Sequence, residues 1–287
     1  GVLPYFRRSE ANTRGADDLH GGDGPLCVSD LRYVNVLSDA FVSAGEQAGL
    51  PRNRDFNGPV QEGVGLYQVT HKAGERFSAA RAYLRPALGR GNLRVVTGAQ
   101  TLRVVLESRR AVGVEVKVGG GEATTIRARR EVLLAAGALQ SPQLLMLSGI
   151  GPGAHLQSLG IAVALDLPGV GRSLHDHVDV IQVLDAPHLK DLFGLSLAGA
   201  WNAIRGIVEW RRHRTGLLTT NYAEAGGFIR SAPDVDRPDL QLHFVVGDLA
   251  ALGAVGADPL LETRMLGRGL TQQEGHVVAR HLFEHLL

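Results

Sequence analysis

The first residues with chemical potential lie where an apolar run meets a glycine. Val132 to Ala136 is too apolar for a half-exposed strand and predicts a buried strand of a parallel sheet, which Gly137 closes. Ser141 suits the N-cap of a following helix, and Pro142 suits its first turn. A helix N-terminus at the carboxyl end of a buried strand favours a phosphate or another anion. From the residues alone, an ordinary tight turn explains the same pattern and is the favoured alternative.

Two histidines near the end of the sequence have a spacing that can ligate zinc. Residues 281–285 read His-x-x-Glu-His, and on a helix His281 and His285 would share one face. No third ligand follows His285 in the sequence as it stands, so we expect no zinc site. His177 belongs to an Asp-His pair, and we expect a hydrogen-bonded structural histidine there rather than a catalytic base.

Periodicity predicts the elements that must position such residues. Apolar residues recur at helical spacing over 34–48, with Gly49 as the stop. Further helices are expected over 3–10, 78–84, 154–160 and 197–213. Runs of β-formers predict an antiparallel meander built from residues 93–96, 102–106, 112–118 and 124–126. Other strands are expected at 161–165, 178–184 and 240–246.

Composition sets limits on the class of protein. Hydrophobic residues make up 44% and charged residues 21%, with a net charge of +1, which gives no reason to expect a nucleic-acid partner. Cys27 is the one cysteine, which excludes an internal disulfide and a cysteine-based metal site and fits a reducing, cytoplasmic compartment. No apolar run approaches the roughly 18–20 residues that span a bilayer. We expect no signal peptide in the N-terminal residues, because basic residues follow the apolar ones.

Several motifs together resemble a known family. Residues 137–151, GALQSPQLLMLSGIG, resemble the second signature of glucose–methanol–choline oxidoreductases, and LPGVG at 167–171 followed by Asp176-His177 resembles another of its motifs. Further matches in the family's order are LPYF (3–6), HGGDGP (20–25), DFNG (55–58), QEGVG (61–65), SAARAYL (78–84) and AEAGGFIR (223–230). The resemblance covers about residues 2–247 and has features of the choline dehydrogenase and primary-alcohol dehydrogenase branch.

The resemblance implies an α/β fold with a partial Rossmann-like FAD-binding domain and an antiparallel-sheet substrate domain. Residues 1–91 would mix segments of both domains, 92–175 would belong to the FAD domain, 176–247 to the substrate domain, and 248–287 would form a divergent tail. Thr101 stands where relatives contact the adenine through the backbone, and Ala136 and Gly137 would lie close to the dinucleotide. A glycine suits that place because a side chain would hold the cofactor away.

Glu224 is the candidate for the substrate side. A carboxylate at a comparable place faces the quaternary ammonium in choline-oxidising relatives, as the resemblance implies. A structural carboxylate bonded to nearby glycine amides is an equally weighted alternative. Since alcohol dehydrogenases of the family have the same motif, Glu224 does not establish choline as substrate.

Two family features have no counterpart in this sequence. The Gly-x-Gly-x-x-Gly fingerprint that holds the FAD pyrophosphate is absent, and the family's catalytic histidine is expected outside this chain. The resemblance thus implies a parent enzyme that oxidises a primary alcohol, with choline a candidate, by hydride transfer to FAD. We expect the 287 residues alone to be inactive, and an inactive truncated remnant without cofactor is the alternative reading.

The resemblance also sets expectations for partners and location. A small alcohol and an electron acceptor other than nicotinamide are expected, with no nucleic acid and no transmembrane segment. The electron acceptor and the oligomeric state are not fixed by the residues. We expect a cytoplasmic location, and contact with the surface of the inner membrane remains open because relatives often pass electrons to a membrane chain.

Overall fold

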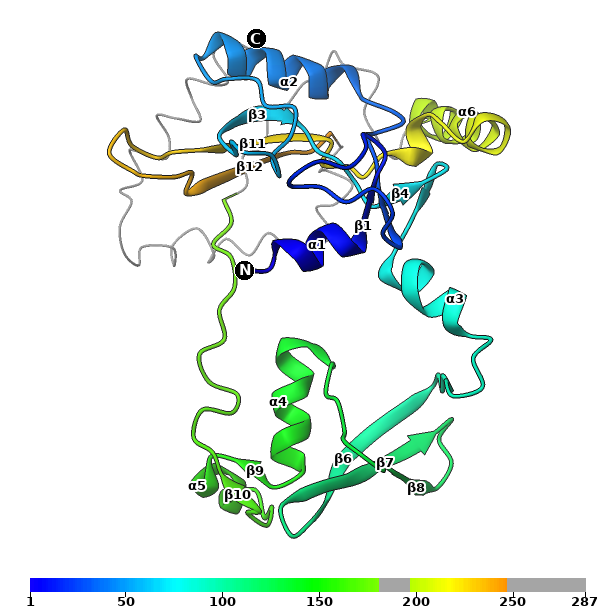
Figure 1. The fold of residues 1–287 in the computed structure, drawn as a ribbon, viewed down its shortest axis with the longest axis vertical. Helices are drawn as coiled ribbons and strands as arrows, with labels where there is room; N and C mark the ends of the chain where they lie inside the picture. The colour runs from blue at the N-terminus through cyan, green and yellow to red at the C-terminus, as the bar shows by residue number, and fades with distance from the viewer. Residues whose placement is uncertain (181–196, 247–287) are drawn as a thin grey trace. The chain divides into compact units, whose positions relative to one another are not determined.

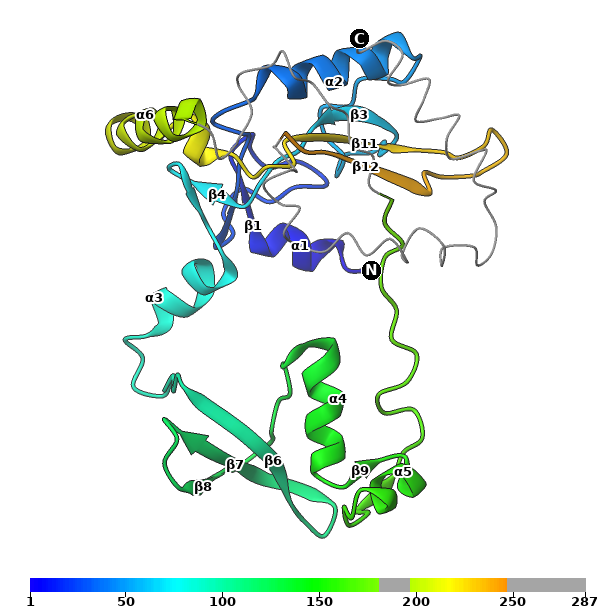
Figure 2. The same ribbon diagram turned by 180° about the vertical axis from the view of Figure 1, so that it is seen from behind.

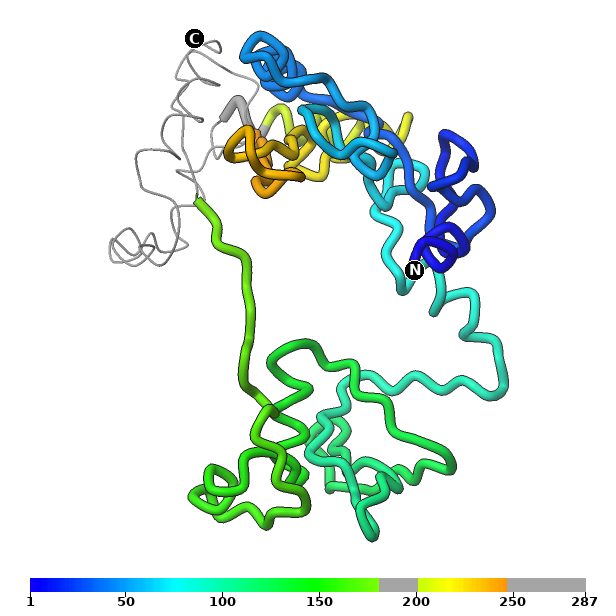
Figure 3. The backbone as a smooth tube through the Cα atoms, turned by 60° about the vertical axis from the view of Figure 1, so that its left-hand side comes forward, coloured from blue at the N-terminus to red at the C-terminus, as the bar shows by residue number. Residues whose placement is uncertain are grey.

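The computed structural model describes residues 1–180 and 197–246. The chain divides into two compact units (Figure 1). One spans Gly1–Gly89 and continues from Val183, and the other spans Arg90–Gln182. The tube in Figure 3 follows the chain out of the first unit, through the second and back, so the first unit is built from two segments of sequence.

The first unit is centred on a three-stranded antiparallel sheet in the order β12-β11-β3. The central strand is β11 (Ala225–Ile229), flanked by β3 (Gly63–Leu66) and β12 (Leu240–Phe244). Gly226 in β11 lets the Tyr67 ring approach the sheet, because a Cβ at this position would collide with the Tyr67 hydroxyl. The hydroxyl donates to the Leu242 carbonyl of β12 at 2.7 Å.

Helix α2 (Val36–Gln47) covers one face of this sheet (Figures 1 and 2). The core between them contains Phe41, Val42, Val64 and Ala225, and the Phe41 ring stacks on Phe244 with centroids 4.7 Å apart. Asn35 caps the helix by accepting the Leu37 backbone N–H at 2.9 Å. Gly49 follows the helix with a φ of +89°, as a C-terminal glycine does.

Shorter elements complete this unit. Helix α1 (Leu3–Ser9) leads into β1 (Glu10–Asn12), which pairs in parallel with β2 (Leu26–Val28). The others are the hairpin β4 (His71–Lys72) and β5 (Glu75–Arg76), the π-helix η1 (Ala80–Leu84), α3 (Arg85–Ala87), α6 (Leu197–His213) and the 3-10 turn η2 (Leu217–Thr219). No helix of the described residues is both long and apolar enough to cross a bilayer.

The second unit contains a separate antiparallel meander, β6 (Ala99–Glu107), β7 (Arg110–Val118) and β8 (Ala123–Arg127). Helix α4 (Gly137–Leu147) packs on β6. Ser148 joins them, because its Oγ accepts the Val104 N–H at 2.8 Å and donates to the Leu144 carbonyl. A short parallel pair, β9 (Ile150–Gly151) and β10 (Leu165–Asp166), flanks α5 (Gly153–Ser158).

The predicted helices over 34–48 and 197–213 are confirmed. The predicted meander is confirmed for its runs at 102–106, 112–118 and 124–126, whereas 93–96 is not a strand. The expected buried strand from Val132 to Ala136 is wrong: these residues form no strand, and Leu133 is 80% exposed. A parallel strand exists only when neighbours pair with it, and no strand among the described residues lies beside this run.

The helix after this run also begins earlier than expected, at Gly137 instead of beyond Ser141, and Pro142 lies inside it. Of the other expected strands, 161–165 contributes only Leu165 to β10. The segment 178–184 is not a strand at residues 178–180, and its remainder lies outside the described residues. The zinc pattern at 281–285 and the expected tail also lie outside them.

Candidate functional site

Gly137 begins α4 in a backbone conformation that favours glycine. Its φ is +86°, and a Cβ built at this position would meet no atom within 4 Å. Packing within the chain therefore does not demand a glycine here; the backbone conformation does, and open space remains over the residue. The first turn of α4 contains no acidic residue, so its free N–H groups suit an anion.

Ala136 and Thr101 lie in the same unit as Gly137. The Ala136 N–H donates to Ser141 Oγ at 3.1 Å, so Ser141 stabilises the start of α4 from within the helix rather than as its N-cap. Thr101 is exposed in β6, opposite Val116, next to a shift of register in the ladder. No hydrogen bond among the described residues joins Thr101 to Ala136 or Gly137. Their roles toward the dinucleotide stay predictions.

Glu224 belongs to the other unit, directly before β11, and its side chain is buried, with the residue 2% exposed. Oε2 accepts the backbone N–H of Asn35 at 2.6 Å and the Ser38 hydroxyl at 2.9 Å. Oε1 accepts the Thr220 hydroxyl at 2.5 Å. Three donors therefore hold the carboxylate at the N-terminal end of α2, where the helix dipole also favours a negative charge.

These partners are not the glycine amides that the sequence suggested as a structural alternative. The donors to the carboxylate are instead a backbone N–H at a helix N-terminus and two side-chain hydroxyl groups. Asn35 is visible in the sequence as a residue type that caps helices, but nothing local links it to Glu224. A substrate-facing role for Glu224 is not tested by these contacts and stays a prediction.

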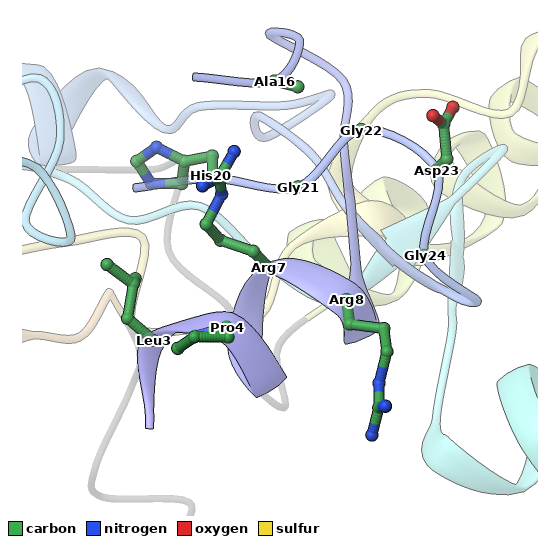
Figure 4. Close-up of a pocket in the computed structure, with 10 residues that line it drawn as sticks. All are labelled: Leu3, Pro4, Arg7, Arg8, Ala16, His20, Gly21, Gly22, Asp23 and Gly24. Atoms are coloured by element: carbon green, nitrogen blue, oxygen red, sulfur yellow. The ribbon is translucent and has the colours of Figure 1, made fainter. Parts of the chain in front are cut away.

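A surface pocket opens between α1 and the glycine-rich loop of residues 16–24 (Figure 4). Arg7 points toward His20, whereas Arg8 points away from it (Figure 4). Gly21 is needed here because a Cβ would collide with the Arg7 carbonyl. The pocket is lined by charges of both signs, Arg7, Arg8 and Asp23, and we assign it no ligand.

His20 is a buried histidine that sequence reasoning did not single out. Its Nδ1 lies 2.9 Å from Asp17 Oδ1, and its Nε2 lies 3.5 Å from Asp55 Oδ2. Backbone N–H groups of Leu19 and His20 also donate to Asp17, and these bonds hold the pKa of that carboxyl below its usual range. His20 Nδ1 is thus bonded to Asp17 within the glycine-rich loop, whereas its buried Nε2 lies near Asp55 without a hydrogen-bond partner among the described residues. No three groups of metal-ligand type cluster anywhere in the described ranges.

The comparison with protein families decides the family. The profile described as GMC oxidoreductase matches residues 1–179, which is more than half of the chain. The chain belongs to the GMC oxidoreductase family. The predicted recognition is thus confirmed, and so is the predicted class, an α/β fold that includes part of the family's FAD domain.

Two curated relatives of this GMC chain carry the expected activities in their names. An oxygen-dependent choline dehydrogenase of Rhizobium johnstonii is 43% identical over 281 residues, covering 97% of the chain and 50% of that protein. An alcohol dehydrogenase [acceptor] of Pseudomonas putida is 44% identical over 246 residues, covering 85% and 44%. Since 97% of the chain is covered, the first match continues past Gly247, further than the sequence analysis expects.

A solved relative supports both fold and cofactor. An FAD-dependent oxidoreductase from Chaetomium thermophilum is 28% identical, with a TM-score of 0.70 over 81% of this chain and 44% of that one. FAD as the cofactor of the family is confirmed at this level. The GMC chain spans about half the length of the curated relatives it matches, so the activity of the whole protein is a matter for proposal.

Proposed function

We propose that the whole protein oxidises a primary alcohol to the aldehyde and that choline is one candidate substrate. The support comes from the names of the two curated relatives, one a choline dehydrogenase and one an alcohol dehydrogenase. When bound, FAD accepts the hydride from the carbon that bears the hydroxyl group. The electron acceptor beyond the flavin, expected to be other than nicotinamide, belongs to the same proposal.

The observation that carries the cofactor assignment is the environment of Gly137. Its positive φ, the open space where a Cβ would stand and the acid-free first turn of α4 fit close approach by a dinucleotide. In this proposal Ala136 and Gly137 bring the backbone to the dinucleotide, and the Thr101 backbone contacts the adenine. A backbone contact does not require the side chain to point at the ligand, so an exposed threonine is compatible with it.

A matched pair of glycines tests this assignment. Gly160 also has a positive φ, +70°, and also has no atom within 4 Å of a built Cβ. Valine at either place should therefore strain the backbone by a similar amount, about 1–2 kcal/mol. G137V should lower the flavin bound per protein at least tenfold, whereas G160V should leave it near the wild-type value. Retention of flavin by G137V, or equal loss in both variants, would contradict the assignment.

For Glu224 we propose a substrate-side charge that acts from a fixed position. The three donors hold its carboxylate in place, and a negative charge attracts a cationic head group without touching it. A neutral alcohol would gain nothing from that charge. The proposed role therefore concerns the choice between choline and neutral alcohols.

A second candidate is a chain without catalytic activity of its own. The observation in its favour is the exposure of large apolar side chains in Arg90–Gln182, among them Leu133 at 80% and Leu139 at 70%. Such surfaces are costly in water and indicate that further chain or cofactor covers them. A colourless product from the complete gene would favour this candidate over the enzyme.

A cytoplasmic location with contact at the inner-membrane surface completes the proposal.

A further inference from the structure

Helix α6 has an apolar stripe on the side that faces away from the body of its unit. Gly206 is buried against Leu218 and Trp210 is half-buried, so this side of the helix faces inward. At 100° per residue, the opposite side presents Trp201, Ile204 and Val208, with Ile207 at its edge. These four side chains are 62%, 54%, 45% and 47% exposed. In two opposite views α6 projects from the edge of its unit (Figures 1 and 2).

Polar contacts at the C-terminal end of α6 fix which side faces outward. Trp210 Nε1 donates to the Gly74 carbonyl at 2.7 Å, and Arg214 Nη1 donates to Glu75 Oε1 at 2.7 Å. The Arg214 guanidinium also lies over the Trp210 ring, 4.1 Å from its centroid. Rolling the helix to bury the stripe would break the contacts to Gly74 and Glu75, so the stripe stays outward.

The charges around the stripe are positive. Arg205, Arg211 and Arg212 are exposed, and the ion pairs of the described residues use none of them. Helical spacing places Arg211 on the outward side and the other two along one edge of the stripe. The one acid within α6, Glu209, lies toward the inward side, where Thr215 donates to it at 3.2 Å.

We propose that α6 docks this protein on an anionic lipid surface. An apolar stripe with tryptophan, flanked by arginines on a helix about 25 Å long, is what such a surface takes up in the plane of the interface. The three arginines favour an anionic bilayer over a neutral one, because each gains attraction near acidic head groups. A neutral protein partner would leave the positive charges of these arginines without opposite charges. This inference specifies the surface for the peripheral location proposed above and does not depend on alcohol oxidation.

Vesicle binding of the full protein tests the proposal without any substrate. Vesicles of phosphatidylcholine with roughly one-third phosphatidylglycerol should bind it at least tenfold more tightly than vesicles of phosphatidylcholine alone. W201S/I204S and R211E/R212E should each weaken binding to the acidic vesicles at least tenfold. The matched controls V60S and R54E change an exposed valine and an exposed arginine away from α6 and should bind like the wild type.

The two tryptophans give a second readout. In versions of the protein whose other tryptophans are replaced by phenylalanine, Trp201 alone should be quenched by brominated acyl chains, whereas Trp210 alone should be quenched far less. Equal binding to both kinds of vesicle, or unchanged binding by both double variants, would overturn the proposal. A wild-type oligomer that W201S/I204S dissociates would show that a second copy occupies the face. Trp201 shielded from iodide without vesicles would show that the rest of the polypeptide covers it. Failure in any of these ways leaves the proposed oxidation untouched.

Discussion

Glu224 Oε2 accepts the backbone N–H of Asn35 at 2.6 Å, although 189 positions separate the two residues in the chain. The bond joins the N-terminus of α2 to the start of the central strand β11. The bond therefore holds α2 over the sheet. The Glu224 carboxylate has this structural role whether or not it also acts on a substrate.

Removal of the Glu224 carboxylate should destabilise the first unit strongly. E224A leaves the Asn35 N–H and the buried Ser38 hydroxyl without their acceptor, and we expect a loss of about 3 kcal/mol in the free energy of unfolding. E224Q should cost only about 1 kcal/mol, since its amide oxygen can accept two donors and its amide NH2 can donate to Thr220. Urea unfolding measures both. E62A, which breaks an exposed pair with Arg230, is the control and should cost less than about 1 kcal/mol.

E224Q also separates the structural role of Glu224 from its proposed role toward the substrate. If its charge acts on the substrate, E224Q should raise KM for choline several-fold and leave KM for a neutral primary alcohol unchanged. Steady-state kinetics with both substrates checks this. An equal change for the two alcohols would leave Glu224 a purely structural carboxylate.

Attachment of α6 should weaken in acid through Glu75. The hydrogen bond from Arg81 and the charges of Arg81 and Arg214 hold the pKa of Glu75 below its ordinary 4.5. The folded state therefore binds fewer protons than the unfolded state near that pH. The stabilisation is present above about pH 4.5 and is lost as the pH falls through the lowered pKa.

E75Q should consequently be less stable than the wild type at pH 7 and approach it near pH 3, both measured by urea unfolding. D18N changes an exposed carboxyl that forms no ion pair among the described residues, and it should track the wild type throughout. A gap between E75Q and wild type that stays constant from pH 7 to pH 3 would argue against the ion pairs as its cause.

The exposed apolar side chains of Arg90–Gln182 should make the 287-residue chain poorly soluble on its own. Replacement of Leu133 and Leu139 by glutamate should raise the soluble fraction and lower binding of a hydrophobic dye. L102E, at a half-buried position of β6, should not help. A wild-type chain that is monomeric and melts cooperatively would be the opposite result.

Local pattern predicts the elements whose causes are local. The helix over 34–48 follows from apolar spacing, a capping asparagine and a closing glycine, and the meander follows from β-rich runs separated by turns. The strand predicted from Val132 to Ala136 is wrong because a parallel strand depends on neighbouring strands, which no local pattern reveals. The predicted start of α4 is wrong because the helix begins at Gly137, whose backbone lies in the left-handed region, and not at the better capping residue Ser141.

For the candidate site, too, the sequence predicts some features and only the structure shows the others. A motif match identifies Glu224, Ala136 and Gly137 as residues of interest, and the structure adds what surrounds them. The partners of Glu224 come from Asn35, Ser38 and Thr220, of which only Thr220 is near in sequence. Long-range hydrogen bonds of this kind are fixed by packing of α2 on β11, so sequence spacing alone does not predict them.

The central claim is that this GMC chain belongs to a flavin-dependent alcohol oxidoreductase. The most direct test is to express the complete gene, record the flavin absorbance of the product, and mix it anaerobically with choline and with simple primary alcohols. We expect a yellow protein whose flavin absorbance is bleached by at least one of these alcohols and recovers when an electron acceptor is added. A colourless protein, or a flavin that no primary alcohol bleaches, would contradict the claim.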